Sequence, residues 1–331
     1  MSLLKLLIIK PGYSETLDPE VSGTVSLGDV FRTTVLLHAF PQSRYEITWV
    51  TDPVAWPLLR GNRMIDHVVK INPFTPFHLT RSYFDVVLNL EKDPGISALA
   101  DTIPAWKRYG FRYDPRADRI AGHAEAEVAL NVALDPGLKQ RLGRNWSEML
   151  YEMVGTRWRG ENYVLGHYPR VPVTHEVGFN YRVGSKFPNK SWPEQSWKGL
   201  ELLCRDAGVS VSWQPAQDNV EEIERYIDWI ASCGLLVTCD SLGLHLALAL
   251  EKPVVALFGP TSHSDVPDGA GLAKLVSPGV SQCASCTARV CTSRHPCMGQ
   301  LSVDAVFERV QAGRSRHRDR VPQTVDGAHA P

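Results

Sequence analysis

Short apolar runs alternate with longer mixed segments along this chain, and the alternation occurs twice. Apolar runs of four to eight residues are typical of strands, and the mixed segments between them are typical of helices. Strands that alternate with helices favour parallel sheets covered by helices on both faces. In the first half we predict strands at Leu6–Ile9, Ile47–Val50, His67–Ile71 and Phe84–Leu90, and helices at Asp29–Ala39, Pro53–Leu59 and Ser147–Val154.

The pattern stops at a linker rich in proline, near residues 166–173, and then restarts. The second round has strands predicted at Val177–Asn180, Val209–Trp213, Leu235–Thr238 and Val254–Phe258, and helices at Trp197–Ala207, Val220–Ser232, Ser241–Leu250 and Val303–Val310. We therefore predict two doubly wound α/β domains, residues 1–168 and 169–312, followed by a disordered polar tail over 313–331. Ligands of such sheets bind outside the carboxyl ends of the strands, so two facing sheets predict a ligand cleft between them.

Composition excludes several classes of protein. The 331 residues are 44% hydrophobic and 21% charged, with a net charge of −1, so no global basic field favours nucleic acid. No apolar run reaches the roughly 18–20 residues that a membrane helix needs. The apolar N-terminus contains Lys5 and ends at Lys10-Pro11, which is typical of a buried strand and not of a signal peptide. We expect a cytoplasmic protein, with at most peripheral contact to the inner face of the membrane.

A polar group stands at the head of a long apolar segment, where Asp240 and Ser241 follow a predicted strand. A helix start has unpaired N–H groups and a partial positive charge, which suits an anion. His245 falls on the same helical face as Ser241, and Gly243 would let a ligand approach the backbone. We interpret these residues as a phosphate or pyrophosphate site, with Asp240 accepting hydrogen bonds from sugar hydroxyls. A capped core helix with one satisfied histidine is the alternative.

The segment from Asp240 to Ala249, followed by Pro253 to Thr261, resembles the C-terminal signature of glycosyltransferase family 9, the ADP-heptose:lipopolysaccharide heptosyltransferases. The resemblance implies a GT-B fold, with two Rossmann-like domains that face a cleft. Family members often have glycine two residues after the aspartate, whereas this chain has Leu242 there. The donor contacts that the resemblance implies are Lys190, Asp240, Ser241, Gly243, Leu244, His245 and Arg182.

Two further segments match the family in the right order. Lys190 begins a Lys-Ser-Trp-Pro segment that resembles one whose lysine contacts the donor phosphates. Gly28-Asp29 resembles the Gly-Asp pair at the head of the first helix, whose aspartate is the family's proposed base. The family usually passes from its first strand to this pair within a few residues, but here residues 11–25 are inserted. That insertion predicts a mobile lid or a different acceptor.

The chemistry implied by the resemblance is inverting transfer of a sugar, heptose in the family, from a nucleoside diphosphate. Asp29 would remove the proton from the acceptor hydroxyl, and Lys190 and His245 would stabilise the leaving diphosphate. No Asp-x-Asp sequence, the usual metal clamp of the other major glycosyltransferase fold, is present, so we expect no catalytic metal. Arg60 and Arg63 are weaker candidates for binding the acceptor, since the family often binds an acidic sugar in this region.

Cys283, Cys286, Cys291 and Cys297 lie within fifteen residues, a density that suits one tetrahedral site. A structural zinc or iron, reduced thiols and a disulfide all fit this spacing. We assign the cluster to stability and not to chemistry.

Three functions are weighed. The first is a sugar transferase acting on a glycan such as lipopolysaccharide core, with a lipid-linked or protein acceptor as the alternative. The second is a silent scaffold with the same fold, which Asp29, Lys190 and His245 argue against. The third is a nucleic-acid-binding protein built around the cysteines, which the absence of aromatic residues between Cys283 and Cys297 disfavours.

Overall fold

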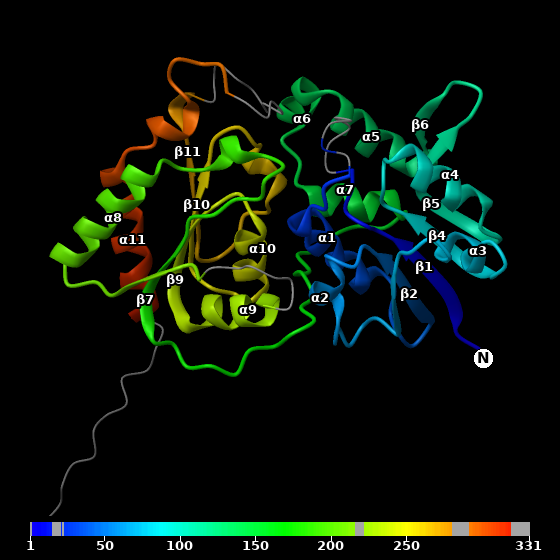
Figure 1. The fold of residues 1–331 in the computed structure, drawn as a ribbon, viewed down its shortest axis with the longest axis horizontal. Coiled ribbons are helices and arrows are strands. Elements are labelled where there is room, and N and C mark those ends of the chain that lie inside the picture. The colour runs from blue at the N-terminus through cyan, green and yellow to red at the C-terminus, as the bar shows by residue number, and fades with distance from the viewer. Residues whose placement is uncertain (1, 15–20, 22, 216–221, 280–290, 319–331) are drawn as a thin grey trace, which may run out of the picture.

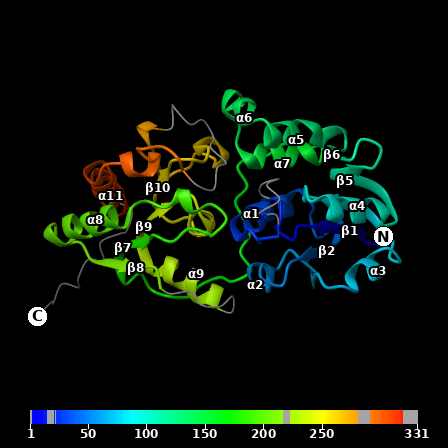
Figure 2. The ribbon, with the colours of Figure 1, turned by 45° about the horizontal axis from the view of Figure 1, so that its top comes forward.

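The chain forms two parallel sheets, each with helices on its faces, that stand side by side with helices α1 (Leu27–Arg32) and α10 (Leu242–Ala249) between them (Figures 1 and 2). The structure is a computed structural model, and it describes residues 2–14, 21, 23–215, 222–279 and 291–318. The α/β class predicted from the alternating sequence is confirmed by these two sheets.

The first sheet has the strand order β3-β2-β1-β4-β5-β6. Its first five strands are parallel, and β6 returns antiparallel to β5 as a hairpin. Leu6, Leu7, Ile8 and Ile9 of the central strand are all buried, because both faces of a parallel strand are covered. The strands are β1 (Leu4–Ile9), β2 (Tyr45–Thr51), β3 (His67–Lys70), β4 (Phe84–Asn89), β5 (Ala105–Asp114) and β6 (Arg119–Gly122).

The second sheet is parallel throughout and has the order β11-β10-β9-β7-β8. Its central strand β9 is buried at every position, which its continuous apolar sequence predicts. The strands are β7 (His175–Asn180), β8 (Val211–Trp213), β9 (Cys233–Cys239), β10 (Val254–Phe258) and β11 (Leu272–Val276).

The helices of the first half follow from local signals. Asp93 and Asn145 accept hydrogen bonds from the first turns of α4 (Pro94–Thr102) and α7 (Trp146–Met153), as helix-capping residues do. The remaining helical segments of this half are short. In chain order they are η1 (Thr33–Ala39), α2 (Trp56–Leu59), α3 (Thr75–Leu79), η2 (Ala124–Ala126), α5 (Glu127–Leu134) and α6 (Pro136–Leu142).

The helices of the second half are amphipathic or wholly buried. In α9 (Ile223–Ser232) the residues Ile223, Tyr226, Ile227 and Ile230 are buried on one face, as their spacing predicts. Helix α10 is buried along most of its length between the two sheets. The other helical segments are η3 (Pro188–Lys190), α8 (Glu194–Asp206), η5 (His263–Asp265), η7 (Cys297–Gln300) and α11 (Val303–Arg318).

The sequence analysis missed one hairpin, and two of its predictions need correction. The hairpin β5–β6 was not predicted, because the exposed side chains of β5 hide its strand pattern. The predicted helix Asp29–Ala39 is a six-residue α-helix followed by a 3₁₀ segment, whose Thr33 and Thr34 hydroxyls donate to carbonyls three residues back. Helix α11 continues to Arg318, into the tail predicted as disordered, and Arg314 there pairs with Glu176 on β7.

The predicted boundary after residue 168 falls in the connection between α7 and β7 and stays a prediction. Among the residues that the structure describes, no helix combines the length and apolarity that a membrane crossing requires.

Candidate active site

The topology of both sheets predicts a ligand site at the carboxyl ends of their strands. In the first sheet, chain connections leave in opposite directions on either side of the β1–β4 pair, and in the second on either side of the β7–β9 pair. Such switch points open a crevice at the carboxyl ends of the strands. Lys10, Glu91 and Lys92 follow β1 and β4, while Asn180 and Asp240 lie at the ends of β7 and β9.

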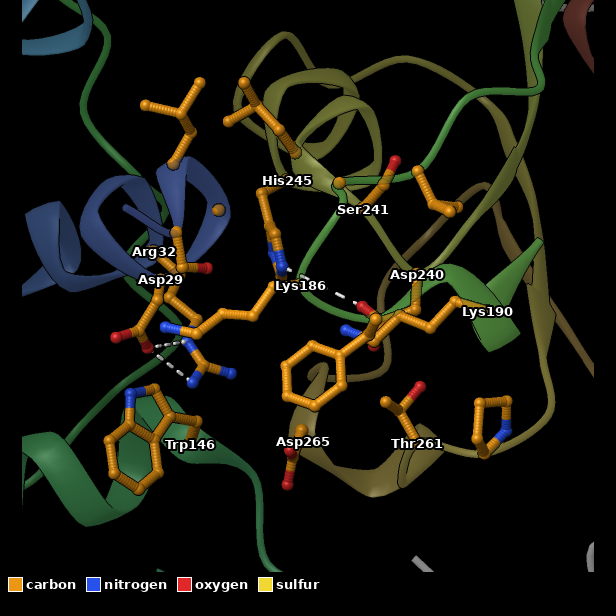
Figure 3. A pocket seen from close by; sticks show the side chains of 18 of the residues that line it. Asp29, Arg32, Trp146, Lys186, Lys190, Asp240, Ser241, His245, Thr261 and Asp265 are labelled. Atoms are coloured by element: carbon orange, nitrogen blue, oxygen red, sulfur yellow. Dashed lines mark hydrogen bonds and ion pairs between the residues drawn. The ribbon is translucent and has the colours of Figure 1, made fainter. Parts of the chain in front are cut away.

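A cavity of about 460 Å³ lies between the two halves, within the range of small-ligand sites. The first half contributes the start of α1, Lys92, Lys139 and Trp146 to its wall. The second half contributes the residues that Figure 3 shows at the opposite wall, which include Lys186, Lys190, Asp240, Ser241, His245, Thr261 and Asp265.

Asp240 is the centre of the wall formed by the second half. Its carboxylate lies 3.4 Å from Lys190 Nζ and 4.0 Å from His245 Nε2 (Figure 3). Burial opposes its ionisation, but the charges of Lys190 and His245 outweigh burial and hold the pKa of Asp240 at about 2. The structure thus brings Lys190, Asp240 and His245 together, as the sequence predicted for a donor site.

Ser241 stands at the N-cap of α10, but its side chain makes no capping hydrogen bond to the helix. Its hydroxyl accepts a hydrogen bond from Asn180 Nδ2 at 2.9 Å, and the same amide donates to Thr238 at 2.7 Å. Tyr226 donates to the amide oxygen of Asn180 at 2.5 Å. This network fixes the end of β9 and the start of α10 relative to β7, so it fixes the direction in which Asp240 and His245 point.

Asp29 lies on the opposite wall and is 3% exposed. Its Oδ2 lies 2.5 Å from Lys10 Nζ, and its Oδ1 accepts hydrogen bonds from Arg32 at 2.7 and 3.1 Å. Burial opposes ionisation of Asp29, but the charges of Lys10 and Arg32 hold its pKa far below the ordinary value. The Arg32 guanidinium is held in turn over the Trp146 ring, 5.0 Å from its centroid.

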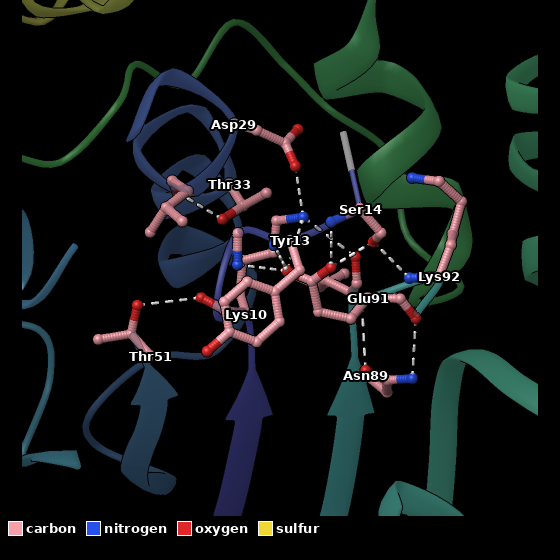
Figure 4. Close-up of polar contacts among 12 residues, drawn as sticks. Lys10, Tyr13, Ser14, Asp29, Thr33, Thr51, Asn89, Glu91 and Lys92 are labelled. Carbon is pink, nitrogen blue, oxygen red and sulfur yellow. Dashed lines mark hydrogen bonds and ion pairs between the residues drawn. The ribbon is translucent and has the colours of Figure 1, made fainter. Parts of the chain in front are cut away.

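Glu91 is a buried carboxylate that the sequence analysis did not single out. It is fully buried beneath Lys10, whose Nζ lies 3.3 Å away (Figure 4). Its oxygens accept hydrogen bonds from the backbone N–H groups of Gly12, Tyr13 and Ser14 and from the Ser14 hydroxyl. Glu91 therefore anchors the first residues of the 11–25 insertion. A charged pair, Glu91-Lys92, directly after a buried strand was the signal in the sequence.

Two contacts join the halves across the cavity. Lys186 donates to the Tyr13 carbonyl at 2.7 Å and to the Thr24 carbonyl at 3.0 Å, so it holds both ends of the insertion. Lys139 on α6 forms an ion pair with Asp265 on η5. Residues 15–20 and 22 of the insertion lie outside the described residues, so its role as a lid stays a prediction.

Four predicted binding residues do not line the cavity. Gly243 packs against Asn180 and Tyr226, and Leu244 is buried in the core. Arg60 pairs with Glu224 and lies over the Trp56 ring, while Arg63 lies 6.0 Å from the Tyr168 ring centroid. Arg182 does line the cavity, and its Nε donates to the Tyr181 hydroxyl at 2.8 Å.

The predicted metal cluster is only partly within the described residues. Cys283 and Cys286 lie outside them, whereas Cys291 and Cys297 lie within them and are half-buried. No group of three or more metal-binding side chains occurs in the described ranges. The structural zinc or iron site therefore stays a prediction, which elemental analysis of protein purified without added metal would test.

Comparison with known proteins relates part of this chain to a known family. Residues 222–296 match the family model described as glycosyltransferase family 9 (heptosyltransferase). The chain is 24% identical over 186 residues to lipopolysaccharide heptosyltransferase 2 of Escherichia coli. That match covers 48% of this chain and 53% of the relative. It is 35% identical over 69 residues to the protein of the same name from Salmonella typhimurium. That match covers 21% of this chain and 20% of the relative. The chain thus spans about half or less of the length of these curated relatives.

Solved structures resemble the whole fold. The structure of E. coli heptosyltransferase WaaC with ADP aligns with a TM-score of 0.62 at 16% identity, covering 94% of this chain and all of that one. A family 9 glycosyl transferase from Veillonella parvula aligns with a TM-score of 0.68 at 17% identity. The alignment covers 96% of this chain and 99% of that one. A dodecameric iron-containing heptosyltransferase, TibC, in complex with ADP-D-β-D-heptose aligns with a TM-score of 0.59 at 11% identity. The alignment covers 96% of this chain and 78% of that one.

Two facing Rossmann-like sheets with a cavity at their carboxyl ends define a protein of the GT-B fold class, as the resemblance implied. Within that class, residues 222–296 match glycosyltransferase family 9, and the chain is similar to heptosyltransferases over part of its length.

Proposed function

We propose that this protein is an inverting glycosyltransferase that moves a sugar, heptose, from a nucleoside diphosphate donor, ADP-heptose, to a glycan acceptor such as lipopolysaccharide core. One observation carries the proposal. The cavity between the sheets places a cationic wall, with Lys190 and His245, opposite the wall that contains Asp29. The names of the similar proteins, heptosyltransferases of which one binds ADP and another an ADP-linked heptose, support this donor and this reaction.

The donor diphosphate would bind at the wall formed by the second half. Lys190 and His245 already converge on one carboxylate, Asp240, which lies between them at the start of α10. The start of α10 adds backbone N–H groups that favour a negative charge. As the bond from the anomeric carbon to the diphosphate breaks, these preorganised donors would stabilise the leaving group, so catalysis needs no divalent ion in this proposal.

The acceptor would enter from the wall formed by the first half, where Asp29 and Lys92 line the cavity. Attack from this wall, opposite the departing diphosphate, inverts the configuration of the anomeric carbon. Arg60 and Arg63 do not line this cavity, so the proposal assigns them no acceptor contact.

Calorimetric titration with ADP, UDP and GDP tests the donor site. We expect ADP to bind most tightly, and Lys190→Ala and His245→Ala each to weaken ADP binding by roughly 1–3 kcal/mol, since each removes a charge-assisted contact. Lys198→Ala is the matched control, because Lys198 is an exposed lysine on the neighbouring helix α8 that pairs with Glu194.

If the wild type and both variants bind ADP with equal affinity, the diphosphate binds elsewhere. Tighter binding of UDP or GDP than of ADP would contradict the proposed donor while leaving sugar transfer intact.

A further inference from the structure

Glu91 is a fully buried carboxylate at the switch point of the first sheet, and the proposed function has not used it. It follows β4, and Figure 4 shows it together with Lys10 and Asp29 above the ends of β1 and β4. Removing a carboxylate from water is costly unless other groups pair with it, so its partners indicate what it does.

The first partner is the Lys10 amine, which lies between two carboxylates. Its Nζ is 2.5 Å from Asp29 Oδ2 and 3.3 Å from Glu91 Oε1, and it donates to the Leu90 carbonyl at 3.3 Å. An ammonium group has three donors, and these three oxygens can accept from all of them. The backbone of Lys10 is fixed as well, because the Thr51 hydroxyl donates to its carbonyl at 3.0 Å. Lys10 is therefore held in one position, and Glu91 supplies one of the two charges that hold it.

The orientation of the Asp29 carboxylate depends on contacts from two elements. Arg32 donates two hydrogen bonds to Oδ1, at 2.7 and 3.1 Å. Arg32 belongs to the same helix as Asp29, so it cannot fix the carboxylate relative to the sheet. Among the described residues, Lys10 is the only cation that pairs with Oδ2, and it directly follows β1. Lys10 therefore ties the Asp29 carboxylate to the end of the central strand.

The same Glu91 carboxylate holds the start of the 11–25 insertion. Its Oε1 accepts hydrogen bonds from the backbone N–H groups of Gly12 and Tyr13, and its Oε2 accepts from the N–H and the hydroxyl of Ser14. Oε1 is also the oxygen that faces Lys10. One carboxylate thus connects the start of the insertion to the contact that orients Asp29.

Stability alone is a weak reason for such a group of charges. Lys10, Asp29 and Glu91 are 2%, 3% and 0% exposed. Buried ion pairs seldom recover the cost of leaving water when they are compared with apolar side chains of similar size. A fully bonded polar network does, however, hold its members in a single arrangement. A base needs such an arrangement, because it has to meet a hydroxyl at hydrogen-bond distance.

We propose that Glu91 is a positioning residue for the base Asp29 and that it acts through Lys10. This inference rests on the proposed function, with Asp29 taking the proton of the attacking hydroxyl as the hydroxyl oxygen bonds to the anomeric carbon. The bond from that carbon to the diphosphate oxygen breaks, and its electron pair leaves with the nucleoside diphosphate. Glu91 contacts neither reactant in this step. It holds the Lys10 amine where the amine orients the Asp29 carboxylate.

Glu91→Gln tests this role, because it removes the charge with little change in volume. Release of ADP from ADP-heptose, with water as the nucleophile, needs no knowledge of the natural acceptor. We expect kcat to fall by about 10–100-fold, as a displaced catalytic group causes. The KM for ADP-heptose and the affinity for ADP should stay within about twofold, because the proposed donor contacts lie in the second half.

Tyr13→Phe is the matched control. It removes the hydrogen bond from the Tyr13 hydroxyl to Asp52, another anchor of the insertion, and leaves Lys10 and Glu91 unchanged. We expect this variant to release ADP with the wild-type kcat. A kcat that falls equally in Tyr13→Phe and Glu91→Gln would show that Glu91 acts only by anchoring the insertion, and the inference would be wrong.

A double-mutant cycle with Asp29→Asn separates positioning of the base from a general disturbance of the site. If Glu91 acts through Asp29, adding Glu91→Gln to the Asp29→Asn protein should change its residual kcat by less than about twofold. A general disturbance would slow both backgrounds by the same factor. That result would overturn the inference, as would a Glu91→Gln protein with the wild-type kcat.

Melting temperatures show whether Glu91→Gln keeps its fold, since the change leaves Lys10 with one counter-charge fewer. If this variant does not fold, the double variant Lys10→Met, Glu91→Gln removes both charges and takes its place in the cycle, with the same expected results. If the wild type neither binds ADP nor releases it from ADP-heptose, the proposed function fails, and the role of Glu91 fails with it. Normal ADP binding and turnover together with an unaffected Glu91→Gln protein would reject the role of Glu91 alone.

Discussion

Two enclosed carboxylates, Asp29 in α1 and Asp240 after β9, are the acidic groups that the site pairs with cations. Asp29 and Asp240 both lie next to cations, and both have lowered pKa values despite burial, which by itself would raise them. Removing one partner of such a pair leaves the other charge buried without compensation, which is costly. The walls of the cavity are therefore held by ion pairs that also contribute to the stability of the fold.

The dependence of stability on pH tests this for Asp240. Its pKa falls from 3.8 in the unfolded chain to about 2 in the folded protein, so the unfolded state binds more protons between these values. The stabilisation is fully present above about pH 4 and is lost as the pH falls through 2, a change of roughly 2 kcal/mol. We expect Asp240→Asn to be destabilised relative to the wild type at pH 7, and the difference to shrink by about this amount at pH 2.

Chemical denaturation of the wild type and of Asp240→Asn at several pH values measures this difference. A gap in free energy of unfolding that stays constant from pH 7 to pH 2 would show that the Asp240 carboxylate is not stabilised by Lys190 and His245.

At the scale of elements, the position of α10 depends on a glycine whose role the sequence did not reveal. Gly243 suggested a close approach of a ligand. In the structure, a Cβ at this position would lie 2.3 Å from Asn180 Nδ2 and 2.5 Å from the Tyr226 hydroxyl. Both partners are distant in sequence, so only the tertiary fold shows that the missing side chain makes room for a hydrogen-bond network.

Gly243→Ala should therefore destabilise the protein by about 1–3 kcal/mol, as overpacking does, and should displace His245 enough to weaken ADP binding. Gly269→Ala is the control, because a Cβ there meets no atom within 4 Å. Thermal melting and ADP titration of the two variants provide the measurement. A Gly243→Ala protein as stable as the wild type would indicate that α10 adjusts freely and that the network does not fix it.

The difference between local sequence patterns and tertiary contacts explains how much of the fold and of the site could be predicted from the sequence. Continuous apolar runs revealed β1, β4, β9 and β10, because buried parallel strands are apolar on both faces. The hairpin β5–β6 was missed because its outer face is polar. Asp29, Lys190, Asp240 and His245 line the cavity as predicted. Asp240 follows a buried strand, and Asp29 and His245 lie in the first turns of helices, so local sequence patterns could place them. Glu91 and Lys92 were missed because their importance comes from Lys10 and Ser14, which are about 80 residues away in sequence.

At the scale of the whole molecule, the two halves share one core. A single cluster of buried apolar side chains includes Leu6 and Phe31 of the first half together with Ile227 and Leu246 of the second. Tyr163, in the connection between the halves, lies 5.9 Å from the Phe31 ring and 5.5 Å from the His245 ring. Domains joined by a small polar interface move and unfold separately, but a continuous apolar core couples them.

We therefore expect the two halves to unfold together, and destabilising one half should destabilise the other. Leu200 on α8 is fully buried in a cluster confined to the second half, so Leu200→Ala should cost about 2–5 kcal/mol. Because unfolding is shared, this loss should appear equally in the hydrogen-exchange protection of β1 and of β9. Leu202→Ala on the same helix is the control, since Leu202 is 47% exposed. If β1 keeps its wild-type protection while β9 loses it, the shared core does not couple the halves and each unfolds by itself.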